Sequence, residues 1–157
     1  MKKVVIIFLA GLVIVLGGLY LFNKIYSHPN TLQENAIKKF YSSYTDRSID
    51  IFNDSVVDSL KLKTEESKSF QKLLYDDLVS FELLEMKENK ENPVNIINGV
   101  SYSKENIAEF TVSYHIDFDK NIYGTAAEGQ QSVRKVIVRK DKNSPWLVAG
   151  QLDGHGY

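Results

Sequence analysis

The sequence predicts an α+β fold behind one N-terminal transmembrane helix, with two to three helices packed on a curved antiparallel sheet of four to five strands. Three observations indicate this fold class. Residues 4–22 form an uncharged, strongly apolar run. Apolar residues recur at helical spacing through most of residues 31–78, and residues 108–118 alternate strictly between apolar and polar side chains. Helices followed by a run of strands are typical of α+β domains.

The apolar run at residues 4–22 has the length and composition of a membrane-spanning helix. At about 1.5 Å rise per residue it would be roughly 28 Å long, close to the thickness of a bilayer's hydrocarbon core. Fourteen of its nineteen residues are Val, Ile, Leu or Phe, whose insertion into a membrane is favourable. Lys2 and Lys3 precede the run and favour a cytoplasmic N-terminus.

We expect this helix to be retained and not removed as a signal peptide. A secretory signal has an apolar core of about 7–15 residues followed by small residues at its cleavage site. The run here is longer, and no small pair follows it. The expected organisation is a cytoplasmic stub at residues 1–3, a signal-anchor at 4–22, a linker at 23–30 and an extracytoplasmic domain at 31–157. The protein would then be a single-pass protein of the cell membrane.

Charge and cysteine content exclude several partners and chemistries. Sixteen of the nineteen basic residues and all twenty acidic residues lie within residues 31–157, so this domain has a formal charge of −4. It has no basic stripe that could follow a nucleic-acid backbone. The chain has no cysteine, which excludes disulfides, thiolate catalysis and thiolate metal ligands.

The first third of the domain is predicted to be helical. Thr31 and Glu34 have the spacing of a capping box at the start of a helix over residues 31–45. Apolar side chains recur along this helix every three to four residues and would form its buried stripe. They are Leu32, Ala36, Ile37, Phe40, Tyr41 and Tyr44.

A second helix is predicted over residues 49–59. Asp50, Asp54 and Asp58 follow each other at four-residue spacing along it, as in a ladder of metal ligands. We interpret them as a solvated face, because one stripe on a helix cannot surround a hard cation with six or more oxygens. No metal or other cofactor is therefore expected.

A short strand and a third helix are predicted next. Residues 60–63 alternate, which predicts the strand. Thr64 would cap the helix, which we expect to end close to Leu78, because Asp76 and Asp77 would be unfavourable near a helix C-terminus. Its buried stripe would be Phe70, Leu73, Leu74 and Leu78. The main alternative is a single helix continuing to Met86.

The second half of the domain is predicted to be a sheet. The strands would be residues 79–87, 94–103, 108–118, 131–140 and 146–151. Asn98 and Gly99 interrupt the second of these with a turn signal. In residues 108–118 the even positions are apolar and the odd ones polar. We therefore expect Phe110 on a helix-covered face and Glu109 on a solvated face.

The order of these elements resembles the nuclear transport factor 2-like superfamily of cone-shaped, cystatin-like α+β domains. The resemblance is carried by residues 36–44, 60–63, 108–118 and 146–150 and covers about residues 31–153. It implies a pocket between the sheet and the helices. The residues that would line this pocket are Tyr41, Tyr44, Phe110, Tyr114 and Trp146. A membrane helix carrying such a domain also resembles the inner-membrane scaffold subunits of conjugation and type IV secretion machines.

His115 and Asp117 are the weak candidates for catalysis. They lie two residues apart on a predicted strand and therefore share a face, as a general-base pair would. That face is opposite the one that carries Phe110 and Tyr114 toward the pocket, so we do not assign catalysis to the pair. No Ser-His-Asp motif, phosphate loop or zinc spacing is present in the sequence.

These patterns lead to one expected function and two alternatives. We expect a non-enzymatic, membrane-tethered domain that binds another protein or itself, as an accessory of a bacterial envelope, secretion or conjugation assembly. One alternative is a small-ligand-binding protein or a pocket enzyme of the same fold. The other is an immunity or inhibitor protein at the membrane surface.

Retention of the anchor can be tested directly. The mature protein should begin near Met1 and fractionate with membranes, because residues 4–22 are long enough to span a bilayer. N-terminal sequencing of the protein from the membrane fraction is the measurement. A mature N-terminus between residues 18 and 31 would show that the segment is removed.

Overall fold

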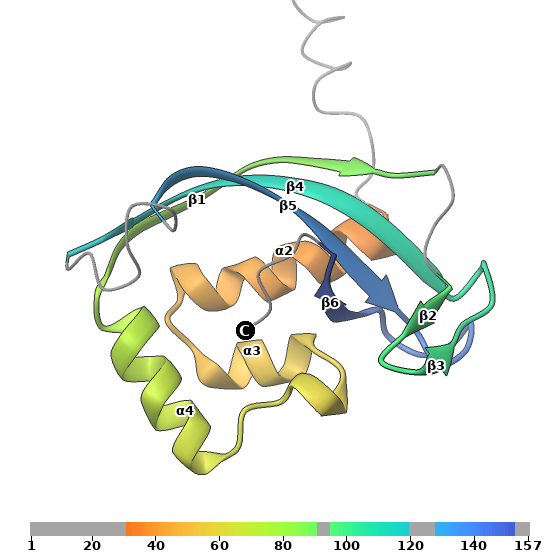
Figure 1. Ribbon diagram of the computed structural model, residues 1–157, viewed down its shortest axis with the longest axis horizontal. Helices are drawn as coiled ribbons and strands as arrows, with labels where there is room; N and C mark the ends of the chain where they lie inside the picture. Colours follow the sequence, from red (N-terminus) through yellow and green to blue (C-terminus); the bar gives the residue numbers. More distant parts are fainter. Residues whose placement is uncertain (1–30, 91–94, 120–127, 153–157) are drawn as a thin grey trace, which may run out of the picture. The chain divides into compact units, whose positions relative to one another are not determined.

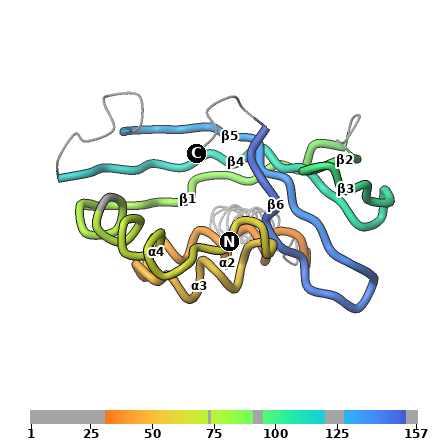
Figure 2. The backbone as a smooth tube through the Cα atoms, turned by 60° about the horizontal axis from the view of Figure 1, so that its bottom comes forward, coloured from red at the N-terminus to blue at the C-terminus, as the bar shows by residue number. Residues whose placement is uncertain are grey.

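Helices and strands form two layers in the computed structural model, which describes residues 31–90, 95–119 and 128–152 (Figure 1). The α+β prediction is confirmed: three α-helices lie on one face of a four-stranded antiparallel sheet (Figure 2). The predicted anchor, linker and stub, residues 1–30, lie outside the described residues. Among the residues that are described, no helix is long and apolar enough to span a membrane.

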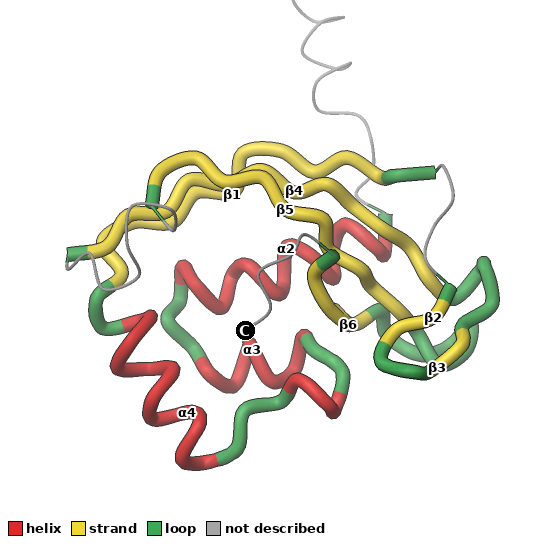
Figure 3. The backbone as a smooth tube through the Cα atoms, viewed as in Figure 1, coloured by secondary structure: helices red, strands yellow, loops and turns green. Residues whose placement is uncertain are grey.

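The sheet has the strand order β1-β4-β5-β6, and every neighbouring pair is antiparallel. Figure 3 shows the strands in yellow. Its strands are β1 Leu78–Glu88, β4 Ile107–Phe118, β5 Gly129–Val138 and β6 Leu147–Gln151. β4 is central, with Val112 opposite Met86 of β1 and Val133 of β5. The strands at residues 79–87, 108–118, 131–140 and 146–151 are therefore predicted correctly, with ends shifted by one or two residues.

The helix-covered face of β4 carries the side chains that its alternation predicts. Phe110, Val112 and Ile116 are buried in the main core, and Tyr114 and Phe118 pack against it. The helices on this face are α2 Leu32–Thr45, α3 Ile49–Ser55 and α4 Thr64–Phe70. The predicted stripe of α2 is buried except at its first member, Leu32, which is exposed. The prediction for Leu32 is wrong because the helix begins there, beyond the core.

Aromatic rings join α2 to the sheet. Phe81 of β1 stacks on Tyr41 with ring centroids 5.3 Å apart, and it lies 5.2 Å from Tyr44. Tyr114 of β4 lies 5.4 Å from both Tyr41 and Phe81. Such pairs contribute about 0.5–1.5 kcal/mol each beyond the area they bury. The position of α2 over β1 and β4 is therefore set by ring packing.

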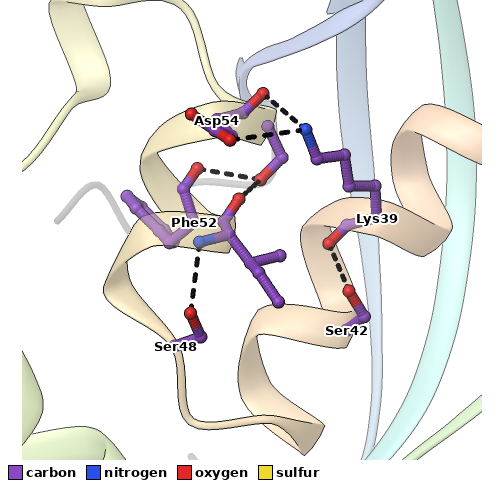
Figure 4. Close-up of polar contacts among 7 residues, drawn as sticks. Lys39, Ser42, Ser48, Phe52 and Asp54 are labelled. Atoms are coloured by element: carbon purple, nitrogen blue, oxygen red, sulfur yellow. Dashed lines mark hydrogen bonds and ion pairs between the residues drawn. The ribbon is translucent and has the colours of Figure 1, made fainter.

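α2 and α3 form a hairpin of helices. The hydroxyl of Ser48 caps α3 by accepting the N–H of Ile51 at 3.3 Å, and Lys39 reaches across from α2 (Figure 4). Its Nζ lies 3.2 Å from the Asp54 carbonyl oxygen and 4.0 Å from the Asp54 carboxylate (Figure 4). These exposed contacts orient the helix pair more than they stabilise it.

α3 ends at Ser55, four residues before the predicted end. Val56 leaves the helix with extended backbone angles and forms a parallel bridge with Val148 of β6. Asp58 therefore lies in a separate 3₁₀ turn, Asp58–Leu60, and pairs with Lys61 at 2.7 Å. The predicted run of three carboxylates on one helix is wrong, because Val56 gains a backbone partner in the sheet.

The predicted strand at residues 60–63 is wrong. The backbone of Leu62 is bonded to the Asn53 side chain instead, with N–H to Oδ1 at 2.8 Å and Nδ2 to carbonyl oxygen at 3.2 Å. α4 then begins one residue after the cap at Lys63, whose N–H donates to the Glu66 carboxylate at 2.9 Å. A wide turn of π-helix, Gln71–Tyr75, follows it. β1 begins at Leu78, which excludes the alternative of one helix continuing to Met86.

A small hairpin packs on the other face of the sheet. Its strands are β2 Ile96–Ile97 and β3 Val100–Ser101. Asn98 and Gly99 have φ angles of 51° and 78°, as a type I′ turn requires. A second core forms beneath it from Ile97, Ile107, Val136, Val138 and Ala149, with Val57, Tyr102 and Leu152 packed against it. Glu109, predicted to be solvated, lies beside this second core on the same face and is only 2% exposed.

The edge strand β1 is interrupted twice. Its pairing with β4 shifts between Leu78 and Ser80 and again between Leu83 and Glu85. The extra residues at these bulges, Val79 and Leu84, are exposed. Bulges on an edge strand discourage pairing with other chains. Val79 therefore offers an exposed aliphatic side chain well suited as a control for substitutions elsewhere.

The two faces of β4 can be distinguished by truncation. Phe110→Ala should lower the free energy of unfolding by about 3–5 kcal/mol, because it removes a core ring that is only 2% exposed. Thr111→Ala should cost about 1 kcal/mol, because it removes one hydrogen bond to Asn89. Urea denaturation of the full-length chain measures both values. Equal losses would contradict the assignment of faces.

Candidate functional site

The predicted pair His115 and Asp117 does meet on one face of β4. His115 Nε2 lies 3.1 Å from Asp117 Oδ2, and Ser80 Oγ of β1 donates to the same oxygen at 2.7 Å. The Ser80 hydrogen bond, with a smaller contribution from His115, lowers the pKa of Asp117. Both side chains are more than two-fifths exposed. Ser80 is bonded to the carboxylate and not to the imidazole, so the group lacks the nucleophile–base–acid order of a hydrolase triad.

The five residues predicted to line a pocket are brought together in the main core. Tyr41, Tyr44, Phe110 and Trp146 are buried there, and Tyr114 is partly buried against them. The ring of Tyr41 lies 5.8 Å from that of Tyr44 and 5.4 Å from that of Tyr114. Trp146 lies one residue before β6. The five residues therefore share one interior.

A residue that the sequence analysis missed, Lys135, lies in that same interior. It is on β5, opposite Phe110 of β4 and Gln151 of β6, and only 4% of its surface is exposed. Its Nζ donates to Gln151 Oε1 at 2.9 Å and lies 5.0 Å from the ring centroid of Phe40 and 6.0 Å from that of Tyr41. The sequence does contain a signal for the burial of Lys135, because this residue lies between Val133 and Ile137 in the two-residue repeat of β5.

The surroundings of Lys135 change its acid–base behaviour. Burial lowers the pKa of its ammonium to about 8. Aromatic faces stabilise the cation, and Gln151 accepts one of its hydrogens. A buried amine of this kind can donate hydrogen bonds to an anionic or carbonyl group, and groups with such shifts are concentrated at functional sites.

A second buried charge ties three strands together on the outer face. Glu109 Oε1 accepts hydrogen bonds from Arg134 Nε at 2.7 Å and from Asn89 Nδ2 at 2.8 Å. Asn89 also accepts the hydroxyl hydrogen of Thr111 at 3.2 Å. Arg134 is on β5 and Asn89 follows β1, so the cluster links β1, β4 and β5. We assign it a structural role, because each contact joins neighbouring strands.

An open hollow of about 430 Å³ lies beside the hairpin. Its walls come from Val57 and Asp58 after α3, residues 100–103 of the hairpin, Asn106, residues 138–140 at the end of β5, and Leu147 of β6. Residues 57–58, 100–106 and 138–147 are three regions distant in sequence, and they come together because β6 pairs with β5 and is bridged to Val56. Val57, Val138 and Leu147 make part of the lining apolar, while Arg139 and Lys140 add positive charge.

The guanidinium of Arg139 is held firmly at this hollow. It donates to Asn106 Oδ1 at 3.0 Å, to the Glu105 carbonyl at 2.9 Å and to the Lys142 carbonyl at 3.4 Å. It also lies over the ring of Trp146 at 4.9 Å. All three acceptors are neutral oxygens. The positive charge of Arg139 is therefore fixed in position without being neutralised by these contacts.

Fold and site together describe an α+β domain with a buried lysine in its main core and a cationic hollow at one end. In the described residues, no group of three or more His, Asp or Glu is placed to hold a metal ion. The chain belongs to the family described as domain of unknown function DUF4829, which matches residues 34–151. That span runs from α2 to the last residue of β6. Neither a curated protein nor a solved structure matches the chain.

Burial of Lys135 should make stability depend on pH in the alkaline range. Its folded pKa of about 8 is below the usual 10.5, so between these values only the unfolded chain keeps the proton. Stability should therefore rise by about 3 kcal/mol as pH increases from 8 toward 10.5. It should fall again above pH 10, because burial raises the pKa of Tyr75 to about 12.

Lys135→Met should remove that rise and should stabilise the protein at pH 7, since it replaces a desolvated cation by an apolar side chain of similar length. Urea denaturation at pH 7, 8, 9 and 10 measures the effect. Lys87→Met, at an exposed position on β1, is the matched control and should leave the pH dependence unchanged. The same rise in Lys135→Met as in the wild type would contradict the assignment.

Proposed function

We propose that this protein is an extracytoplasmic binding domain, tethered to the cell membrane by residues 4–22, that binds another protein through the hollow beside the hairpin. One observation carries the proposal. Val100 of the hairpin is 51% exposed and lines the hollow, whereas Ile96, which is 56% exposed, lies on the opposite face of the hairpin. An exposed aliphatic side chain in the wall of a concave surface is typical of interaction sites.

The arrangement of titratable groups supports binding over catalysis. His115 and Asp117 are solvated and lie on the sheet face opposite the helices. Lys135 is in the main core, on the other side of the sheet from them. General acid–base catalysis requires such groups to converge on one reacting atom. A tethered protein that recruits a partner needs no such convergence.

We also infer that the domain is a member of the nuclear transport factor 2-like superfamily. The order of helices before strands supports this, as do the three helices on one face of a curved four-stranded sheet. In that setting the protein would be an accessory of a bacterial envelope, secretion or conjugation assembly.

Lys135 favours a second candidate, a small-ligand-binding protein that uses the interior between sheet and helices. The ammonium and Gln151 would recognise an anionic or carbonyl group, and the surrounding rings would contact its apolar part. Lys135→Met would then abolish ligand binding while the fold is retained. This candidate and the leading one use different surfaces, so variants separate them.

Photo-crosslinking from the hairpin tests the leading proposal. The benzophenone amino acid p-benzoylphenylalanine, placed at Val100 of the full-length chain in cells, should give one discrete protein adduct. The same probe at Val79, which is 60% exposed on β1, should give none. Mass spectrometry of the adduct distinguishes a second copy from another protein.

Two further results bear on the same proposal. His115→Ala should leave the adduct unchanged, because its imidazole lies on an exposed face with few contacts. If His115→Ala abolishes the cellular phenotype while the protein keeps its normal stability, catalysis or partner binding at the His115–Asp117 face of β4 is favoured instead. Adducts of equal strength from Val79 and Val100, or none from either, would contradict a hairpin-centred binding site.

A further inference from the structure

We propose that the segment bound in the hollow is an extended acidic peptide, with an apolar side chain against Val100 and Leu147 and carboxylates facing Arg139 and Lys140. The inference rests on the binding function proposed above and names the chemistry of its partner. Charge, the fixed guanidinium and the free edge of the hairpin each support it.

The charge at the hollow is opposite to that of the domain. Residues 31–157 have a formal charge of −4, yet Arg139 and Lys140 both line the hollow. Asp58 also lines it, but Lys61 pairs with this carboxylate at 2.7 Å. A local positive field on an acidic domain attracts acidic partners to this hollow.

Arg139 has the geometry of a carboxylate-recognition group. A guanidinium has five N–H donors, and its contacts with described residues use three of them. Trp146 supports the guanidinium plane from one side at 4.9 Å. Because these contacts hold the side chain in place, a ligand carboxylate binds it without the entropy loss of ordering a free arginine.

The hairpin provides backbone as well as side chains. Among the strands of the described residues, β3 pairs with β2 alone, and residues 100–103 form one wall of the hollow. An extended peptide can add to such an edge through main-chain hydrogen bonds, with alternate side chains pointing to opposite sides. One side chain would then enter the hollow while its neighbours remain at the charged margin. A flat lipid surface could neither form main-chain hydrogen bonds with the β3 edge nor insert a side chain into the hollow.

Binding of defined peptides tests the partner chemistry. The probe is a fluorescein-labelled hexapeptide of alternating Glu and Val with blocked ends, compared with matched peptides carrying Gln or Lys in place of Glu. Fluorescence anisotropy with the full-length chain in mild detergent should show the acidic peptide binding at least tenfold more tightly than the Gln peptide. The Lys peptide should not bind, and added salt should weaken the acidic complex.

Paired substitutions locate the site. Lys140→Glu and Val100→Asp should each weaken binding of the acidic peptide at least fivefold. Lys87→Glu and Val79→Asp make the same chemical changes at exposed positions on β1 and should have no effect. Arg139→Lys should also weaken binding, because an ammonium cannot replace the planar fork. Melting temperatures of all five variants show whether each is folded.

Each outcome decides between alternatives. Equal binding of the three peptides, absence of binding, or indifference to Lys140→Glu and Val100→Asp overturns the proposal. Lys140-dependent binding to phosphatidylglycerol vesicles without peptide binding overturns it in favour of a lipid surface. If Val100 still gives a protein adduct in cells while the acidic peptide does not bind, only the acidic chemistry fails. If both experiments fail, the binding function of the hollow fails with it.

Discussion

Stacking of Phe81 on Tyr41, with Tyr44 and Tyr114 beside them, is the contact on which the rest of the fold depends. It attaches α2 to β1 and β4 of the sheet. α3 then packs on α2 through the ring pair Phe40–Phe52. Rings have a large area and few rotatable bonds, so they set the spacing between layers at low entropic cost. The cation of Lys135 is accommodated at the margin of this aromatic layer.

The sheet buries apolar side chains on both faces, and the division of these side chains between two cores determines where the hollow lies. Ile137 of β5 enters the main core, while Val136 and Val138 enter the second one under the hairpin. Because the second core covers only one end of the outer face, the hairpin stands beside the ends of β5 and β6 and leaves a concave surface there. A peptide site and a solvated strand face can therefore coexist on the same side of the sheet.

The fold could be predicted where the apolar–polar alternation extends over many residues and the packing of adjacent elements is consistent with it. Residues 108–118 alternate over six periods, and the face carrying Phe110 is the one that the helices cover. Residues 60–63 alternate too briefly, and the Asn53 side chain decides their backbone bonding instead. Glu109 was predicted to be solvated because its burial depends on the hairpin and on Arg134, which are far away in sequence. Lys135 was missed although the alternation of Val133 and Ile137 in β5 places it on the core face. The hollow combines three regions distant in sequence, residues 57–58, 100–106 and 138–147, which no local pattern can reveal.

The bridge between Val56 and Val148 has a consequence for how the chain folds. The two residues are 92 positions apart, so closing that loop carries a larger entropic penalty than forming either of the neighbouring helices or the strand pair β4–β5. Contacts of this kind form late in folding. Until the Val56–Val148 bridge forms, one edge of β6 is unpaired and Leu147 and Val57 do not yet line a common surface. The surface assigned to partner binding would thus be the last part of the domain to mature, after the aromatic layer is complete.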